Sequence, residues 1–119
     1  DGTGVRDYIH VTDLARGHTA ALDFLAENRG FHAFNLGTGE GYSVKEVVEE
    51  YARQSRKDIP FRYGARRIGD VAECIADPSK ANRLLAWQAK FTLKDMCIDA
   101  LRFCKNRSKV ASNAYEIVE

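Results

Sequence analysis

Apolar side chains recur at every third or fourth position in several stretches of this chain, which is the spacing of one face of an α-helix. The pattern predicts a helix over residues 14–27, a second from Ser43 to about Ser55, a short third from residue 78 to 85, and a last one over residues 92–106. The first ends where residues 28–30 (N-R-G) supply a helix stop.

Each predicted helix follows a residue whose side-chain oxygen can accept a hydrogen bond from the free N–H groups of the first turn. These cap residues are Thr12 or Asp13, Ser43, Asp77 and Thr92. Ser43 and Glu46 also fit the reciprocal capping box, and Thr92 with Asp95 fits its aspartate version. Each of these pairs therefore marks the start of a helix.

Short runs of β-favouring residues predict strands at residues 6–11, 31–36 and 59–63. Together the elements predict a mixed α/β fold with about three short strands and four helices, with Trp87 folded back onto the core. We expect one domain over residues 1–106. Residues 107–119 show no clear period, so we expect a loosely ordered tail.

The composition narrows the classes of function that the chain can have. A length of 119 residues with 45% hydrophobic side chains supports one modest core, and a net charge of +1 provides no global field for nucleic acid or an anionic membrane. Three cysteines without paired spacing favour a reducing, cytoplasmic location over a disulfide framework or a zinc site. The three histidines also lack the spacing of a metal site. The chain opens with D-G-T-G rather than a methionine or a signal sequence, so we expect it to be cut from a longer polypeptide.

Two segments hold the candidate chemistry. Arg6 lies in V-R-D-Y-I-H-V at residues 5–11, and Arg67 and Asp70 lie in R-R-I-G-D-V-A-E-C at residues 66–74. Guanidinium groups bind phosphate oxygens two at a time, so arginines in two segments suggest a diphosphate site, and a nearby carboxylate can turn toward sugar hydroxyls. The plainer alternatives are a surface ion pair between Arg6 and Asp7 and a solvated loop at residues 66–74.

Both motifs resemble the substrate-domain motifs of the UDP-glucose 4-epimerase family, which belongs to the extended short-chain dehydrogenases. The resemblance covers about residues 1–106 and implies a small C-terminal substrate domain. It implies that Arg6 and Arg67 contact the UDP diphosphate, that Asp70 contacts the ribose or nearby groups, and that Arg66 supports them. It also implies that Cys74 borders the hexose, where a small residue leaves room that a tyrosine would fill. We therefore expect acceptance of UDP-N-acetylhexosamines beside UDP-glucose and UDP-galactose.

The resemblance implies NAD as the cofactor of the full-length enzyme, together with a catalytic tyrosine that is followed four residues later by lysine. No tyrosine in this chain has a lysine at that spacing. The glycines of residues 37–41 (G-T-G-E-G) do not match the dinucleotide-binding spacing, and we interpret them as a turn before the Ser43 helix. We therefore expect no catalytic residue, no bound NAD and no activity in the isolated chain, and we expect a missing N-terminal NAD-binding domain as its partner.

Two alternatives stay open. One is a UDP-pentose or UDP-uronate 4-epimerase of the same family, because the double-arginine loop is shared widely there. The other is a free-standing nucleotide-sugar binding module without catalysis. The resemblance favours neither of these alternatives but a UDP-hexose 4-epimerase, and it implies that the complete enzyme is a homodimer.

Overall fold

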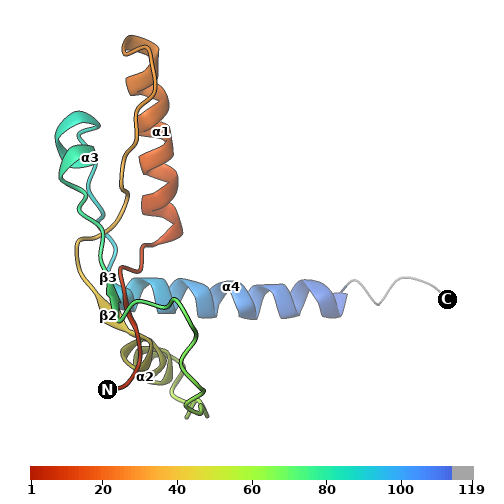
Figure 1. Ribbon diagram of the computed structural model, residues 1–119. Helices are drawn as coiled ribbons and strands as arrows, with labels where there is room; N and C mark the ends of the chain where they lie inside the picture. The colour runs from red at the N-terminus through yellow and green to blue at the C-terminus, as the bar shows by residue number, and fades with distance from the viewer. Residues whose placement is uncertain (114–119) are drawn as a thin grey trace.

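The computed structural model describes residues 1–113, with side chains described as far as Arg107. Over these residues the order of elements is β1 (Val5–Arg6), α1 (Val11–Glu27), β2 (Tyr42–Ser43), α2 (Val44–Ser55), β3 (Glu73–Cys74), α3 (Ser79–Leu84) and α4 (Leu93–Asn113) (Figure 1). The described part is thus a mixed α/β fold with three strands and four helices, as the sequence predicts. No helix in it is both long and apolar enough to cross a membrane.

The sheet is small and its central strand is β1. The strand order is β2-β1-β3, with β1 antiparallel to β2 and parallel to β3. Each strand contains only two residues. Because so short a ladder makes few backbone hydrogen bonds, the segments that meet at the sheet need other contacts to hold them.

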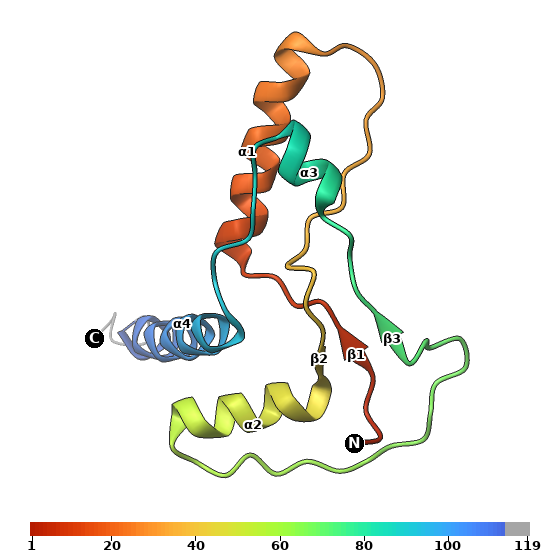
Figure 2. The same cartoon turned by 90° about the vertical axis from the view of Figure 1, so that its left-hand side faces the viewer.

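The strands predicted at residues 31–36 and 59–63 are wrong. Residues 31–36 alternate between exposed and partly buried positions, but Phe34 and Leu36 pack with side chains of α1 instead of pairing in a strand. Figure 2 shows this part of the chain running back from the end of α1 toward β2. The contact is close at Gly17, where an added Cβ would lie 2.6 Å from Leu36 Cδ1. Residues 60–63 form part of an exposed loop without strand structure.

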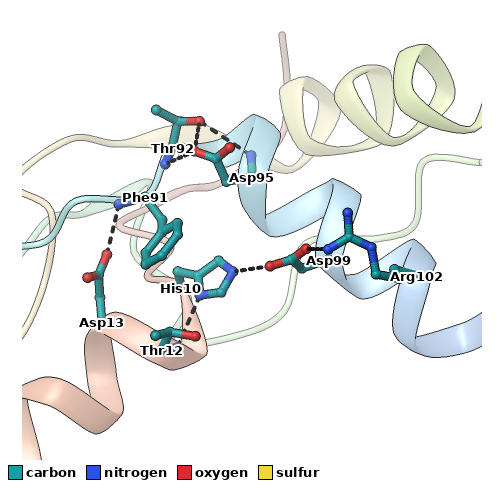
Figure 3. Close-up of polar contacts among 8 residues, drawn as sticks. All are labelled: His10, Thr12, Asp13, Phe91, Thr92, Asp95, Asp99 and Arg102. Atoms are coloured by element: carbon teal, nitrogen blue, oxygen red, sulfur yellow. Dashed lines mark hydrogen bonds and ion pairs between the residues drawn. The ribbon is translucent and has the colours of Figure 1, made fainter.

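The predicted strand at residues 6–11 is too long, because α1 begins at Val11. Its cap is neither Thr12 nor Asp13 but His10, whose Nδ1 accepts a hydrogen bond from the Thr12 N–H at 3.0 Å. The ring proton of a neutral His10 then lies on Nε2, which faces Asp99 at 3.3 Å. The ring is buried and stacks on Phe91. His10 is thus a structural link between α1 and α4 (Figure 3).

Two of the other helix starts agree with the sequence. Ser43 and Glu46 form the reciprocal capping box of α2, and Thr92 and Asp95 exchange hydrogen bonds at the start of α4. The cap predicted at Asp77 is one residue too early, because Pro78 holds the cap position of α3; Asp77 still accepts from the N–H and the hydroxyl of Ser79. The last helix, however, continues past Asn106 to Asn113, so the expected tail begins as helix, and residues 114–119 lie outside the described residues.

The apolar core is divided between two sides of the sheet. On one side Ala81, Leu85 and Trp87 pack with partly buried side chains from α1 and from the extended segment, so Trp87 folds back as predicted. On the other side α2 packs on α4, where Leu93 and Cys97 are buried. Cys104, seven residues after Cys97 on the same helix, is exposed.

Asp13 joins the first core to the start of α4. Its side chain is fully buried, and its Oδ2 accepts from the N–H groups of Lys90 and Phe91 at 2.8 and 2.9 Å. Its Oδ1 accepts from Arg16 at 2.6 Å, and its backbone carbonyl accepts from Trp87 Nε1 at 3.0 Å. A charged group so deep in a protein is tolerable only when it is paired and hydrogen-bonded. The segments that donate to Asp13 must therefore stay in place for the carboxylate to remain buried.

The described chain has an open shape. Its Cα radius of gyration is 18.6 Å, against about 13.5 Å for a compact domain of this length. α4 projects away from the rest in Figure 1, and α1 and α2 lie on opposite sides of the sheet. Between the start of α1, α2 and α4 lies an apolar groove of about 540 Å³, lined by residues that include Ile9, Val47, Tyr51, Met96 and Phe103.

Replacement of Asp13 by asparagine tests the role of the buried carboxylate. We expect Asp13→Asn to lower the free energy of unfolding by about 2 to 4 kcal/mol, because the amide loses the charge-assisted bonds and turns a donor toward other donors. Urea unfolding followed by the fluorescence of Trp87, the single tryptophan, measures this. Asp23→Asn, at an exposed position of the same helix, is the control and should change stability little. If Asp13→Asn and Asp23→Asn lowered the free energy of unfolding equally, the structural role of the buried Asp13 carboxylate would be contradicted.

The cysteines should differ in reactivity. Burial, with a smaller contribution from Glu50, raises the pKa of the Cys97 thiol to about 11, so this group stays protonated and unreactive at pH 8. Cys74 is exposed. We expect iodoacetamide at pH 8 to alkylate Cys74 quickly and Cys97 only after unfolding in urea, measured by peptide mass spectrometry. Similar rates for both in the folded protein would show that Cys97 is not in a core.

Candidate functional site

The sheet places Arg6 and Cys74 side by side. β1 and β3 pair in parallel register, with Arg6 opposite Cys74 and Val5 opposite Glu73. The Val5 N–H donates to the carbonyl of Ala72 at 2.8 Å, and the Asp7 N–H donates to the carbonyl of Cys74 at 3.2 Å. Two of the residues singled out from the sequence, 68 positions apart, therefore meet on neighbouring strands.

Asp70, from the loop before β3, also lies next to Arg6. Its Oδ1 lies 3.4 Å from Nη2 of Arg6, in an ion pair whose members are one-third and about half exposed. The expected surface pair between Arg6 and Asp7 is thus replaced by a pair between Arg6 and Asp70. An exposed pair of this kind contributes about 1 kcal/mol or less, so an anionic ligand could displace Asp70 from the guanidinium.

The double-arginine loop forms a turn around Gly69. The Asp70 N–H donates to the carbonyl of Arg67 at 3.3 Å, and Gly69 has a φ of +88°, which a residue with a side chain rarely adopts. Arg66 donates to the carbonyl of Asp70 at 3.2 Å, so it supports the turn. Arg67 is exposed on the same loop. The four candidate residues thus lie on the paired strands β1 and β3, which carry Arg6 and Cys74, and on the loop before β3, which carries Arg67 and Asp70.

Gly4 and the backbone of β1 set the direction of Arg6. Nη1 of Arg6 donates to the carbonyl of Val5 at 2.7 Å. A Cβ added to Gly4 would lie 3.1 Å from the same nitrogen, so the absence of a side chain there leaves room for the guanidinium to fold back. The remaining N–H groups of Arg6 face Asp70 and solvent, which is an arrangement that suits an anion.

Asp7 is a residue of this site that the sequence reasoning missed. Its carboxylate accepts four hydrogen bonds, from the N–H groups of Thr38, Gly39 and Ala76 and from the Thr38 hydroxyl. The sequence did draw attention to Asp7, because it lies within the same motif as Arg6. Its position next to Arg6, however, suggested only a local ion pair between the two residues. Its partners lie 31 to 69 positions away, where no sequence spacing reveals them.

The glycines of residues 37–41 form the predicted turn before β2 and α2, and they are needed for two different reasons. Gly39 has a φ of +77° and needs the freedom of glycine. Gly37 and Gly41 instead allow close approach, because a Cβ at Gly41 would lie 2.6 Å from both Ile75 and Val5. Two N–H groups of this turn, on Thr38 and Gly39, already donate to Asp7 and are not available to a dinucleotide phosphate.

Other chemistry is sparse in the described part of the chain. No group of three or more His, Cys, Asp or Glu side chains there is arranged to hold a metal ion. His10 belongs to the structural link described above, and His18 and His32 contact backbone carbonyls of their own segments. The residues that could bind a ligand are therefore those around Arg6.

Comparison with known proteins gives consistent matches. Residues 1–100 match the family model described as GDP-mannose 4,6 dehydratase. The chain is 54% identical over 103 residues to the UDP-glucose 4-epimerase of Bacillus subtilis, covering 87% of this chain and 30% of that protein. The chain thus spans about 30% of the length of such relatives.

Solved structures agree with the sequence matches. The UDP-glucose 4-epimerase from Bifidobacterium longum in complex with NAD⁺ and UDP superposes with a TM-score of 0.86 at 47% identity, over 91% of this chain and 32% of that chain. The UDP-Glc/GlcNAc 4-epimerase of Campylobacter jejuni gives a TM-score of 0.77 at 43% identity, over 89% and 32%. The chain therefore belongs to the GDP-mannose 4,6 dehydratase family of extended short-chain dehydrogenases and corresponds to one part of its UDP-glucose 4-epimerase members.

Proposed function

We propose that this chain is the substrate-binding part of an NAD-dependent UDP-glucose 4-epimerase, which interconverts UDP-glucose and UDP-galactose. The observation that carries the proposal is that Arg6 lies opposite Cys74 on the neighbouring strand and is paired with Asp70 from the loop that also carries Arg67. The epimerase relatives and the UDP-containing structure from Bifidobacterium longum support it.

Arg6 and Arg67 would hold the diphosphate. A planar guanidinium matches phosphate oxygens two at a time, and two arginines from separate segments can bind both phosphates of a diphosphate. The exposed contact of Arg6 with Asp70 is weak enough to exchange for a phosphate. Asp70 would then be released toward the hydroxyl groups of the ribose. This anchoring spends binding energy on position, so that the sugar can be presented to the reacting groups while UDP stays fixed.

The reacting groups would come from outside these 119 residues. NAD, when bound in the full-length enzyme, supplies hydride chemistry at C4 of the sugar. The chain holds no tyrosine with lysine four residues later, and the Thr38 and Gly39 amides of its glycine turn are bonded to Asp7. We infer that an NAD-binding segment joins this chain in the full-length protein and packs on its apolar groove. The open shape and the exposed Val11 and Phe103, which line the groove, support this, because apolar surfaces of that kind are usually covered. The chain alone would be inactive.

Cys74 would set the range of sugars. Its side chain is exposed and small, so it leaves room beside the hexose for an N-acetyl group, and the UDP-Glc/GlcNAc 4-epimerase of Campylobacter jejuni is among the relatives. We therefore include UDP-N-acetylhexosamines among the proposed substrates. The proposal also includes a cytoplasmic, homodimeric full-length enzyme, for which the family resemblance is the support.

Removal of either arginine should weaken UDP binding. We expect Arg6→Ala and Arg67→Ala in the full-length protein each to cost roughly 1.5 to 3 kcal/mol of binding free energy, because each removes a charged hydrogen bond to the diphosphate. Isothermal titration calorimetry with UDP measures this. Arg83→Ala, at an exposed position of α3, is the matched control and should bind as the wild type does. Wild-type affinity in both site variants would contradict the diphosphate site.

A larger side chain at position 74 should narrow the range of substrates. We expect Cys74→Tyr in the full-length enzyme to abolish turnover of UDP-N-acetylhexosamines and to spare UDP-glucose and UDP-galactose, because the ring fills the space of the acetamido group. Steady-state assays with both substrate pairs measure this, and Cys74→Ser is the control of similar size. Loss of both activities, or of neither, would contradict the role of Cys74.

A further inference from the structure

We propose that Asp7 is a positioning residue for Arg6: its carboxylate fixes the strand that presents the guanidinium to the diphosphate. The inference rests on the proposed function, since it concerns the same ligand. It adds a residue that touches no substrate and acts through its neighbour in the chain.

The carboxylate of Asp7 joins three segments that are far apart in the sequence. Its Oδ1 accepts from the N–H and the hydroxyl of Thr38 at 2.9 and 2.6 Å, and its Oδ2 accepts from the N–H groups of Gly39 and Ala76 at 2.9 and 3.3 Å. The segments are the end of β1, the glycine turn and the residues that follow β3. All of these contacts are made by the residue that directly follows Arg6 in the chain.

The sheet needs this junction because its own hydrogen bonds are few. β1 and β3 each contain two residues, and the backbone bonds that flank their pairing are Val5 N–H to Ala72 and Asp7 N–H to Cys74. With Asp7 held by its side chain as well as its backbone, the Cα of Arg6 is fixed from one side. The backbone that carries the guanidinium is therefore already fixed before the ligand binds, and this lowers the conformational entropy that is lost when the guanidinium binds a phosphate.

Only a carboxylate of this length suits the junction. An asparagine has one donor group, and in either orientation its NH₂ would face a backbone N–H, that of Thr38 on one side or those of Gly39 and Ala76 on the other. A glutamate would need more room. Gly37 shows how little there is, because a Cβ there would lie 2.5 Å from Oδ2 of Asp7 and 2.5 Å from the Cβ of Ala76.

The same contacts explain how a negative charge can lie next to a site for a diphosphate. Four donors surround the two oxygens of Asp7, and three of them are backbone N–H groups that cannot turn away. They offset the charge of the carboxylate, as amides do at a helix N-cap. The carboxylate therefore neither pairs with Arg6 nor presents a bare charge to the ligand.

The test is a double-mutant cycle in the full-length protein, with UDP affinity as the readout. We expect Asp7→Asn to weaken UDP binding by about tenfold, because it misplaces a guanidinium whose complete loss in Arg6→Ala weakens binding by about tenfold to a hundredfold. In an Arg6→Ala background the same substitution should have little further effect, because the residue through which it acts is gone. Asp58→Asn, an exposed aspartate of the loop after α2, is the matched control and should leave affinity unchanged.

Full additivity of Asp7→Asn and Arg6→Ala would overturn the inference, as would wild-type affinity in Asp7→Asn. If Asp7→Asn does not fold, as judged by the fluorescence of Trp87, Thr38→Val carries the test, because it removes the hydroxyl that donates to Asp7 and leaves the three N–H donors in place; the same hydroxyl also accepts from the Glu40 N–H. It should weaken UDP binding in the same direction by about threefold, a part of one hydrogen bond, and again only when Arg6 is present. An unchanged affinity in Thr38→Val would then overturn the inference.

The outcomes separate this inference from the proposed function. A wild-type protein that binds UDP and loses affinity in Arg6→Ala, but not in Asp7→Asn, supports the proposed function and rejects the role of Asp7. A wild-type protein that does not bind UDP rejects the proposed function, and the role of Asp7 falls with it.

Discussion

The carboxylate of Asp13 lies fully buried where α1, the Trp87 segment and the start of α4 meet, and the arrangement of the helices depends on it. It accepts from two consecutive N–H groups, those of Lys90 and Phe91, and so fixes the chain just before α4 begins. His10, one turn earlier, extends the same link to Asp99 on α4. An unpaired buried charge would cost several kcal/mol, so the segments that donate to Asp13 cannot separate cheaply.

Asp7 repeats this solution on the ligand side of the molecule. Both aspartates belong to one continuous segment, residues 7–13, that runs from the end of β1 into the first turn of α1, and both bind N–H groups from segments that the short strands cannot hold. The segment thus positions two regions of the molecule. One of its ends positions the paired strands that carry Arg6 and Cys74, and the other positions α4 and one wall of the apolar groove. In the proposed enzyme, the site for UDP and the surface for the NAD-binding segment would be fixed by the same few residues.

Local signals in the sequence predicted the helices well. The capping box at Ser43 and Glu46 and the exchange between Thr92 and Asp95 are contacts within four residues, so the sequence alone contains both partners. The strands were predicted poorly, because alternation shows an extended segment but not its partner: residues 31–36 alternate as expected and yet lie on α1. β2 and β3 were missed because two residues are too few to give a pattern. Among the site residues, resemblance selected Arg6, Asp70 and Cys74, which the structure brings together, while the role of Asp7 depends on contacts that no local pattern shows.

In the proposed enzyme, Arg6 and Arg67 together hold the diphosphate of a UDP-sugar beside the β1–β3 pair. The decisive measurement is a crystal structure of the full-length protein with UDP. We expect both guanidinium groups within hydrogen-bond distance of diphosphate oxygens, about 2.7 to 3.2 Å, with Asp70 released from Arg6. A diphosphate bound elsewhere, with Arg6 still paired to Asp70 and Arg67 in solvent, would contradict it.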